Sequence, residues 1–353
     1  MNSYERIKRM YEHKEADRIP IIDDPWAGTI RRWHREGMPA DMDWCDYFDA
    51  DKIGVINIDI SPRMPVRRLE ENDRWYIETS SWGVTMKHFK EEDSTPEFLD
   101  FTITTEEAWE KAKKQMTVED DRIPWQMLKD NYDQWRAEGR WLRGVFWFGF
   151  DVTHSWMMGT ENLLMSMVEE PELIEDMFAT YLDRSKQLFN RIWDAGYKFD
   201  EMFWYDDMGY KGTTFFSPNM YRNMLKPYHT EAVNWAHDHG IYAQLHSCGD
   251  IMTLLPDVVE TGVDALNPIE VKAGMDVLGI KKQYGDKLTL RGGINAVLWD
   301  HPDQIIAEID AKVPVLKENG GFIFSSDHSI PNSVSLENMK AIIEEVKRVG
   351  SYK

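Results

Sequence analysis

The sequence predicts a (β/α)8 barrel of the TIM type with an N-terminal elaboration. In the second half of the chain, helical stretches repeatedly end at glycine and are followed by a short run rich in apolar and β-branched residues. These runs are "AGYKFDEMFWYDD", "HGIYAQLHSCGD", "TGVDALNPIE", "YGDKLTLRGGIN" and "NGGFIFSSDHS". Glycine ends a helix because it adopts the left-handed conformation at no steric cost. The runs have the composition of buried parallel strands, so the alternation predicts parallel βαβ units.

Two earlier segments, 18–24 and 141–150, have the same strand character, and we expect an eighth strand within 50–90. Seven or eight βα units in 353 residues fit a barrel. The alternative is an open doubly wound sheet, but no glycine-rich nucleotide-binding fingerprint follows a strand. Because no Pro-, Gly- or Ser-rich linker divides the chain, we expect a single domain over residues 1–353, with 60–140 as an insertion around the barrel.

Composition indicates a globular protein of the cytoplasm. Hydrophobic residues make up 42% of the chain, and no apolar run reaches the roughly 18 residues that a membrane span requires. The charged, helical N-terminus lacks the apolar core of a secretory signal. The two cysteines cannot form a disulfide framework, which favours a reducing compartment.

The net charge of −21 disfavours nucleic acid and anionic membranes as partners. It also disfavours a polyanionic substrate unless basic residues gather in the pocket. Solubility alone is a sufficient alternative reason for this charge. The sequence does not indicate an oligomeric state.

Polar side chains follow the predicted strands, where a barrel holds its active site. Such residues are common at strand ends, but together these would surround one cavity with side chains of metal-ligand type. They are Asp23, Asp24, Asp206, Asp207, His246, Cys248, Asn267, Glu270, Asn295, Asp327 and His328.

His246 and Cys248 are the strongest candidates for a pair of metal ligands, because a spacing of two directs both side chains to one side of an extended chain. Imidazole and thiolate are favoured zinc ligands. The alternative is a buried cysteine beside a hydrogen-bonded histidine. A zinc site needs a third protein ligand, for which we predict His328, with Glu270 in reserve. Cys45 is a poor candidate because it lies far from any predicted strand end.

The remaining predicted site residues are acids and aromatics. We predict that Asp206 and Asp207 handle protons or orient the substrate, although either could instead be a strand-end hydrogen-bond partner. Glu270 could be a general acid or a further ligand. Aromatic side chains near strand ends are predicted to line a ligand cavity, with core packing as the alternative for each. They are Trp26, Trp147, Trp204 and Tyr205.

The chain resembles the uroporphyrinogen decarboxylase superfamily. The resemblance is carried by "DDMGYKGTTFFSPNMYRNMLKPYH", "HGIYAQLHSCGDI", "LRGGINA" and "GGFIFSSDHSIPNSVSLENM", with weaker matches at "ADRIPI", "SSWGV" and "GTENLLMSMVEEPEL". The resemblance covers most of the chain and implies a (β/α)8 barrel.

Two branches of that superfamily differ in chemistry. The decarboxylases use no cofactor and bind a porphyrinogen with eight carboxylates, which calls for clustered arginines. Here the first strand ends in "IPIIDDPWAG", where the decarboxylases carry an arginine-containing loop. The other branch contains zinc methyltransferases, among them methylcobamide:coenzyme M methyltransferases, marked by His-x-Cys and a later cysteine. "LHSCGD" matches the first mark, and His328 stands where the second cysteine would align.

The resemblance therefore implies a zinc-dependent methyltransferase that moves a methyl group between a small methylated substrate, or a thiol, and a corrinoid. The implied cofactors are Zn²⁺ and a corrinoid, free or on a partner corrinoid protein. Histidine in place of a thiolate would leave zinc more electrophilic, which favours demethylation of a methoxy or methylamine substrate. The alternatives are a uroporphyrinogen decarboxylase and a non-catalytic binding protein on the same barrel.

Overall fold

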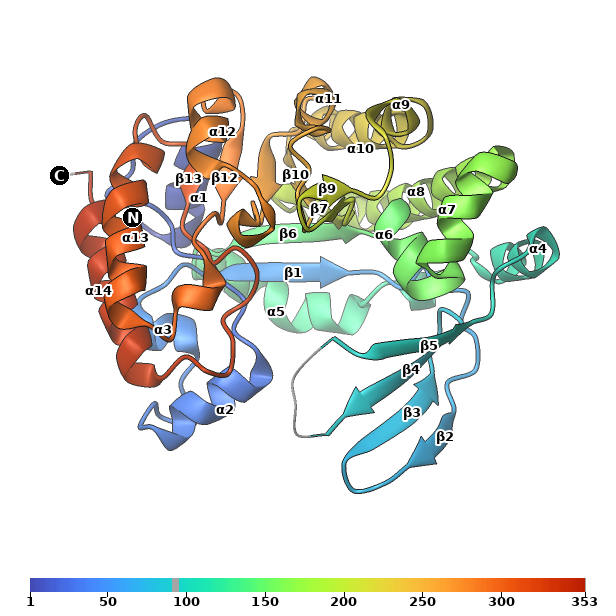
Figure 1. Cartoon of the computed structure of the whole chain (residues 1–353), viewed down its shortest axis with the longest axis horizontal. Coiled ribbons are helices and arrows are strands. Elements are labelled where there is room, and N and C mark those ends of the chain that lie inside the picture. Colours follow the sequence, from blue (N-terminus) through green and yellow to red (C-terminus); the bar gives the residue numbers. More distant parts are fainter. Residues whose placement is uncertain (91–94, 353) are drawn as a thin grey trace.

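The computed structural model describes residues 1–90 and 95–352 (Figure 1). Its centre is a curved parallel sheet in the order β1-β6-β7-β10-β11-β12-β13. Each strand pairs with the next one of the sheet along the chain, as βα units require. The strands are β1 Ile53–Asn57, β6 Trp141–Phe146, β7 Glu201–Tyr205, β10 Tyr242–His246, β11 Ala265–Asn267, β12 Thr289–Arg291 and β13 Phe322–Ile323.

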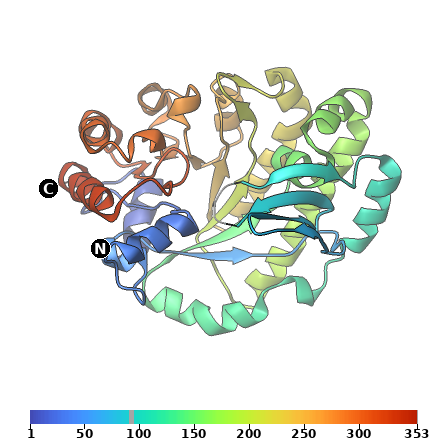
Figure 2. The same ribbon diagram turned by 60° about the horizontal axis from the view of Figure 1, so that its bottom comes forward.

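Helices lie outside the curve of this sheet; most of the longer ones connect successive strands, and α14 follows the last strand (Figures 1 and 2). In the part of the chain that the structure describes, no helix is long and apolar enough to cross a membrane. The α-helices are α1 Ser3–Tyr11, α2 Ala27–Arg35, α3 Trp44–Phe48, α4 Glu106–Gln115, α5 Trp125–Ala137, α6 Phe150–Thr153, α7 Thr160–Glu169, α8 Pro171–Asp194, α9 Pro218–Met220, α10 Lys226–Asp238, α11 Leu255–Glu260, α12 Val277–Tyr284, α13 Pro302–Leu316 and α14 Leu336–Gly350. Shorter turns are the 3-10 helices η1 Asp120–Arg122, η4 Val271–Ala273 and η5 Ala296–Leu298, and the π-helices η2 His154–Met158 and η3 Tyr221–Leu225.

The parallel βα units predicted from the sequence are confirmed, and β1 is the strand expected within 50–90. The predicted strand at 18–24 forms isolated bridges instead of a regular strand. Ile22 N–H donates to the Phe324 carbonyl over 3.0 Å, and Asp51 N–H donates to the Ile21 carbonyl over 2.9 Å. Pro20, which has no N–H to donate, lies in this segment and limits its ladder.

A second, antiparallel sheet lies in the predicted insertion 60–140 and stands in front of the parallel sheet in Figure 2. Its strands are β2 Arg68–Glu71, β3 Trp75–Thr79, β4 Val84–Phe89 and β5 Glu97–Phe101. Phe98 packs edge-on against Trp156 at 6.1 Å between ring centroids, and Trp82 lies 6.5 Å from Trp147. The insertion therefore packs against the segment that follows β6.

A buried polar network fills the amino-terminal end of the parallel sheet. The Glu201 carboxylate accepts hydrogen bonds from Arg143, from Tyr11 Oη at 2.6 Å and from Trp141 Nε1 at 2.7 Å. Arg143 also donates to Gln244 Oε1 over 3.0 Å. This ion pair is almost completely buried, with its charges matched by hydrogen bonds as burial requires.

Candidate metal centre

The carboxyl ends of β7 and β10 bring three side chains of metal-ligand type together. Because His246 pairs with Tyr205 in register, the residues just beyond each strand lie side by side. Asp206 N–H donates to the His246 carbonyl over 2.7 Å, and Cys248 N–H donates to Asp207 Oδ1 over 2.7 Å. These bonds hold Asp207 directly against the His246–Cys248 turn.

Glycine permits the turn after Cys248. Gly249 has φ +80°, and a Cβ at this position would lie 2.1 Å from the Gly209 carbonyl carbon. Gly209 N–H in turn donates to the Cys248 carbonyl over 3.2 Å. Gly209 belongs to a short hairpin, β8 Gly209–Tyr210 and β9 Thr213–Thr214, which therefore packs directly on the cysteine loop.

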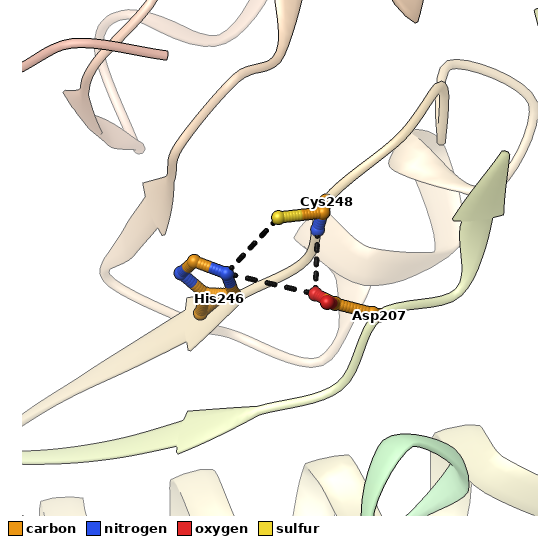
Figure 3. Close-up of side chains that lie close together, drawn as sticks. All are labelled: Asp207, His246 and Cys248. Carbon is orange, nitrogen blue, oxygen red and sulfur yellow. Dashed lines mark hydrogen bonds and ion pairs between the residues drawn. The ribbon is translucent and has the colours of Figure 1, made fainter. Parts of the chain in front are cut away.

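His246, Cys248 and Asp207 have the geometry of a metal-binding group (Figure 3). His246 Nε2 lies 3.2 Å from Cys248 Sγ and 3.6 Å from Asp207 Oδ1. Ligand atoms around a tetrahedral zinc ion are about 3.5 Å apart, given metal–ligand distances of about 2.0–2.3 Å. One ligand atom from each residue lies within 4.8 Å of the others, so a nitrogen, a sulfur and an oxygen donor converge on one position. This donor set fits zinc and leaves a fourth position open.

The surroundings disfavour additional negative charge in the absence of a cation. Burial raises the pKa of the Cys248 thiol, and Asp207, Glu270 and Asp151 raise it further. Burial and the Asp151 carboxylate raise the pKa of Asp207. Burial, helped by Arg291, lowers the pKa of His246 to about 4, so its imidazole is neutral near pH 7 and has a lone pair to offer. A bound cation would stabilise the thiolate and the carboxylate together.

Glu270 lies next to this group without being part of it. Its Oε2 accepts the Gly249 N–H over 2.7 Å, and its Oε1 is 3.5 Å from Lys272 Nζ. Cys248, Glu270 and Lys272 line an open depression of about 460 Å³ beside the hairpin. Glu270 therefore holds the cysteine loop and lines the depression beside Cys248.

The structure does not bring His328 into the group. His328 stacks on Trp26, with 6.4 Å between ring centroids, and lines a neighbouring depression of about 300 Å³. Lys272 borders both depressions. Of the residues that the structure describes, Asp207 supplies the third ligand atom beside His246 and Cys248. The assignment of His328 as a ligand stays a prediction.

The four predicted aromatic residues have different settings. Tyr205 packs edge-on against His246 at 4.8 Å and lies 6.0 Å from Trp147. These two and Trp26 keep some exposed surface near the strand ends. Trp204 is completely buried against Phe148 and His229, so it offers no surface to a ligand.

Asp206 faces away from Asp207 into a buried hydrogen-bond chain. Its Oδ2 lies 2.7 Å from His229 Nε2, and His229 Nδ1 lies 2.9 Å from Tyr221 Oη. Its Oδ1 accepts the Asp151 N–H over 2.8 Å. The two adjacent acids therefore have different settings. Asp207 belongs to the metal-binding group, whereas Asp206 bonds to α6 through Asp151 N–H and to α10 through His229.

Sequence reasoning missed Asp151 and His154, whose side chains lie 3.2 Å apart beyond the end of β6. The sequence does contain a pattern that could have identified them. In "FGFDVTH", polar residues follow a buried strand, just as in "WYDD" two acids follow β7. The contact between His229 and Asp206 could be identified only from the folded structure, because the two residues lie on different elements. Trp82, from the insertion, also joins the aromatic residues near the site.

Comparisons with known proteins identify the family of the chain. A family model described as uroporphyrinogen decarboxylase (URO-D) matches residues 2–349. Uroporphyrinogen decarboxylases of Pelodictyon phaeoclathratiforme and Chloroherpeton thalassium are each 31% identical to the chain, over 105 and 108 residues. These matches cover 28% and 29% of this chain, and only 28% and 30% of the relatives' own length.

The solved structure of a methyltransferase from Methanosarcina mazei is similar over 99% of both chains, with a TM-score of 0.67. At 15% sequence identity, this similarity shows a common fold alone. Because the family match extends over nearly all of the sequence, the chain belongs to the uroporphyrinogen decarboxylase (URO-D) family.

Proposed function

We propose that this chain is a zinc-dependent methyltransferase. It would move a methyl group between a small methylated substrate, or a thiol, and a corrinoid held free or by a partner protein. The observation that carries the proposal is the convergence of His246, Cys248 and Asp207 at the strand ends. We further propose that the whole chain is one domain, with Pro20–Ile22 completing an eighth position that closes the barrel.

His246, Cys248 and Asp207 would hold the zinc ion. When bound, zinc would act as a Lewis acid on the sulfur, oxygen or nitrogen atom that carries or receives the methyl group. The chain's own groups would orient the substrate, and Glu270 is positioned to do so because it borders the depression beside Cys248. Tyr205 and Trp147 would form the apolar side of the site, and Trp26 its far rim.

The ligand set favours demethylation of a methoxy or methylamine substrate over methylation of a thiol. A carboxylate donates less electron density than a thiolate, so a single cysteine with Asp207 would leave the ion more electrophilic than two cysteines would. If His328 replaced Asp207 as the third ligand, one negative charge fewer would strengthen the same preference.

The test is methyl transfer by the zinc-loaded chain with free cobalamin. Reduced cobalamin would be offered methanol, methoxybenzenes and methylamines, and methylcobalamin would be offered 2-mercaptoethanol as the thiol. We expect transfer from a methoxy or amine donor, lost in Cys248→Ala. A protein that binds no metal and catalyses none of these reactions would instead be a binding protein on the same barrel.

Uroporphyrinogen decarboxylation is the second candidate, because the curated relatives carry that name. Its substrate would bring eight carboxylates to a site where Asp23 and Asp24 follow the first segment of the sheet. Arg291, a cation beside them, is already paired with Asp24 at 3.0 Å. We expect no conversion of uroporphyrinogen to coproporphyrinogen, and efficient conversion would replace the methyltransferase proposal.

The third ligand can be decided by substitution. We expect Asp207→Ala to lower zinc content sharply and His328→Ala to leave it nearly unchanged, because the ligand atoms that converge are those of Asp207, His246 and Cys248. If His328→Ala loses the metal, the loop carrying His328 must close over the site, and His328→Cys should then restore binding because thiolate suits zinc. Loss of zinc only in Glu270→Ala would make Glu270 the ligand.

A further inference from the structure

An acid–histidine pair lies beyond the end of β6, beside the metal-binding group. Asp151 belongs to α6, and His154 begins the π-helix η2. In Figure 1, α6 lies just beyond the arrowheads of β6 and β7. π-Helical turns are rare and often occur at functional sites. Nothing in the zinc chemistry described above uses this pair.

The hydrogen bonds of the pair leave one oxygen atom available. His154 Nε2 lies 3.2 Å from Asp151 Oδ1, which also accepts a hydrogen bond from Ser155 Oγ over 3.1 Å. His154 Nδ1 lies 3.1 Å from Thr160 Oγ1, so both ring nitrogens are occupied. Within residues 1–90 and 95–352, Asp151 Oδ2 has no hydrogen-bond partner, although the side chain is only 16% exposed.

Two connections hold the pair next to the metal-binding group. Asp151 N–H donates to Asp206 Oδ1, and Asp206 precedes Asp207 in the chain. On the other side, the His154 ring lies 5.9 Å from Phe215, which lies 5.8 Å from Tyr210 of the hairpin that borders Cys248.

The pair is held rigidly in an apolar setting. The Phe150 ring stacks on His154 at 4.9 Å, and η2 packs under the insertion through Trp156 and Phe98. Gly149, at φ +95°, lets the backbone pass Asp206 where a Cβ would lie 2.3 Å from the carboxylate. A fixed acid in a partly dry site is suited to proton transfer.

We propose that Asp151 is the catalytic acid of the demethylation, delivering a proton through Oδ2 to the heteroatom that loses the methyl group. When the carbon–heteroatom bond breaks, its electron pair stays on the heteroatom, and the nucleophilic acceptor, a reduced corrinoid, supplies the pair for its new bond to carbon. The heteroatom then takes one proton from Asp151. His154 and Ser155 are positioning residues that hold Asp151 Oδ1, and solvent returns the proton to Asp151. This inference rests on the proposed function.

The experiment compares two methyl donors that differ in their need for a proton. Methoxybenzene leaves as a strongly basic phenolate, whereas 4-nitromethoxybenzene leaves as a weakly basic one. We expect Asp151→Asn to slow transfer from methoxybenzene by about 10²–10⁴-fold, the usual contribution of a general acid. Transfer from the nitro compound should fall by less than about tenfold, and Asp151→Glu should recover part of the loss.

His154→Phe should show the same dependence on the leaving group, more weakly. Asp183→Asn, at an exposed site of α8, is the matched control and should change neither rate. Equal slowing of both donors by Asp151→Asn, at unchanged zinc content, would overturn the proton role and leave the methyltransferase proposal standing. Absence of transfer by the wild-type, zinc-loaded chain would overturn both.

Discussion

The two ends of the parallel sheet differ in how they hold acidic side chains. The same strands place a paired carboxylate at one end and a cluster of metal-ligand type at the other. At the amino-terminal end, Glu201 of β7 is surrounded by donors and paired with Arg143. At the carboxyl end, Asp207, just beyond β7, meets the neutral imidazole of His246 and the thiol of Cys248, and no Lys or Arg of the described residues is paired with it. A buried charge that is paired with an opposite charge of the same chain stabilises the fold. Ligand atoms that converge without such a partner are instead arranged to bind a cation from solution.

The largest expected effect is at the amino-terminal end. Glu201→Ala leaves the Arg143 guanidinium buried without its carboxylate, which should lower the free energy of unfolding by about 3–5 kcal/mol. Urea unfolding measures this change in the free energy of unfolding. The fraction of the Glu201→Ala protein that remains folded should keep its zinc. Arg143→Met combined with Glu201→Leu should be much less harmful, and a double variant as unstable as Glu201→Ala would contradict the structural role of the pair.

A smaller effect concerns Asp23, a buried carboxyl at the other end. Burial raises its pKa to about 6, against the Ser326 bonds that lower it. The folded state therefore holds this proton more tightly than the unfolded chain does, so Asp23 makes the protein less stable as pH rises from about 4 to 6, by up to about 3 kcal/mol. Unfolding across this range with Asp23→Asn as reference measures it. Ser326→Ala should move the window to higher pH, and a difference between wild type and Asp23→Asn that does not vary with pH would contradict the account.

The smallest stability effect is expected at Gly212, and a comparison with Gly249 gives it a functional readout. Gly212 and Gly249 both have positive φ, but a Cβ meets nothing within 4 Å at Gly212 and meets Gly209 at Gly249. Gly212→Ala should cost about 1 kcal/mol of backbone strain and leave zinc content unchanged. Gly249→Ala should displace Cys248 and lower zinc affinity. Equal zinc binding by the two variants would show that the hairpin contact does not position the cysteine.

The sequence predicted what depends on local pattern. The repeat of helix, glycine and apolar run predicted the parallel strands, and a spacing of two brought His246 and Cys248 to one side of an extended chain. Asp207 was predicted to handle protons or orient the substrate and not to be the third ligand, because its approach to Cys248 depends on the register of β7 against β10. The position of His328 depends on a long loop that no local pattern describes.

The antiparallel sheet could not be predicted from the sequence either, because two of its strands lack a local pattern. Strand β2, "RLEE", is exposed along its whole length, and no residue of β3 is fully buried. Because neither of these two strands has a buried face, neither shows the alternation of apolar and polar residues that predicts a strand. The sheet region reaches the site through Trp82, which lies against Trp147, and through Phe98, which packs on Trp156. These contacts depend on tertiary packing.

The most direct test of the central claim is the zinc content of the purified protein, prepared without chelator and compared with matched variants. Wild type should carry about one zinc ion per chain, as a single mononuclear site requires. His246→Ala, Cys248→Ala and Asp207→Ala should lose most of it, while Cys45→Ala and His237→Ala, which change the other cysteine and an exposed histidine, should keep it. Wild-type protein without zinc or another transition metal, or ligand variants that keep all of it, would contradict the account.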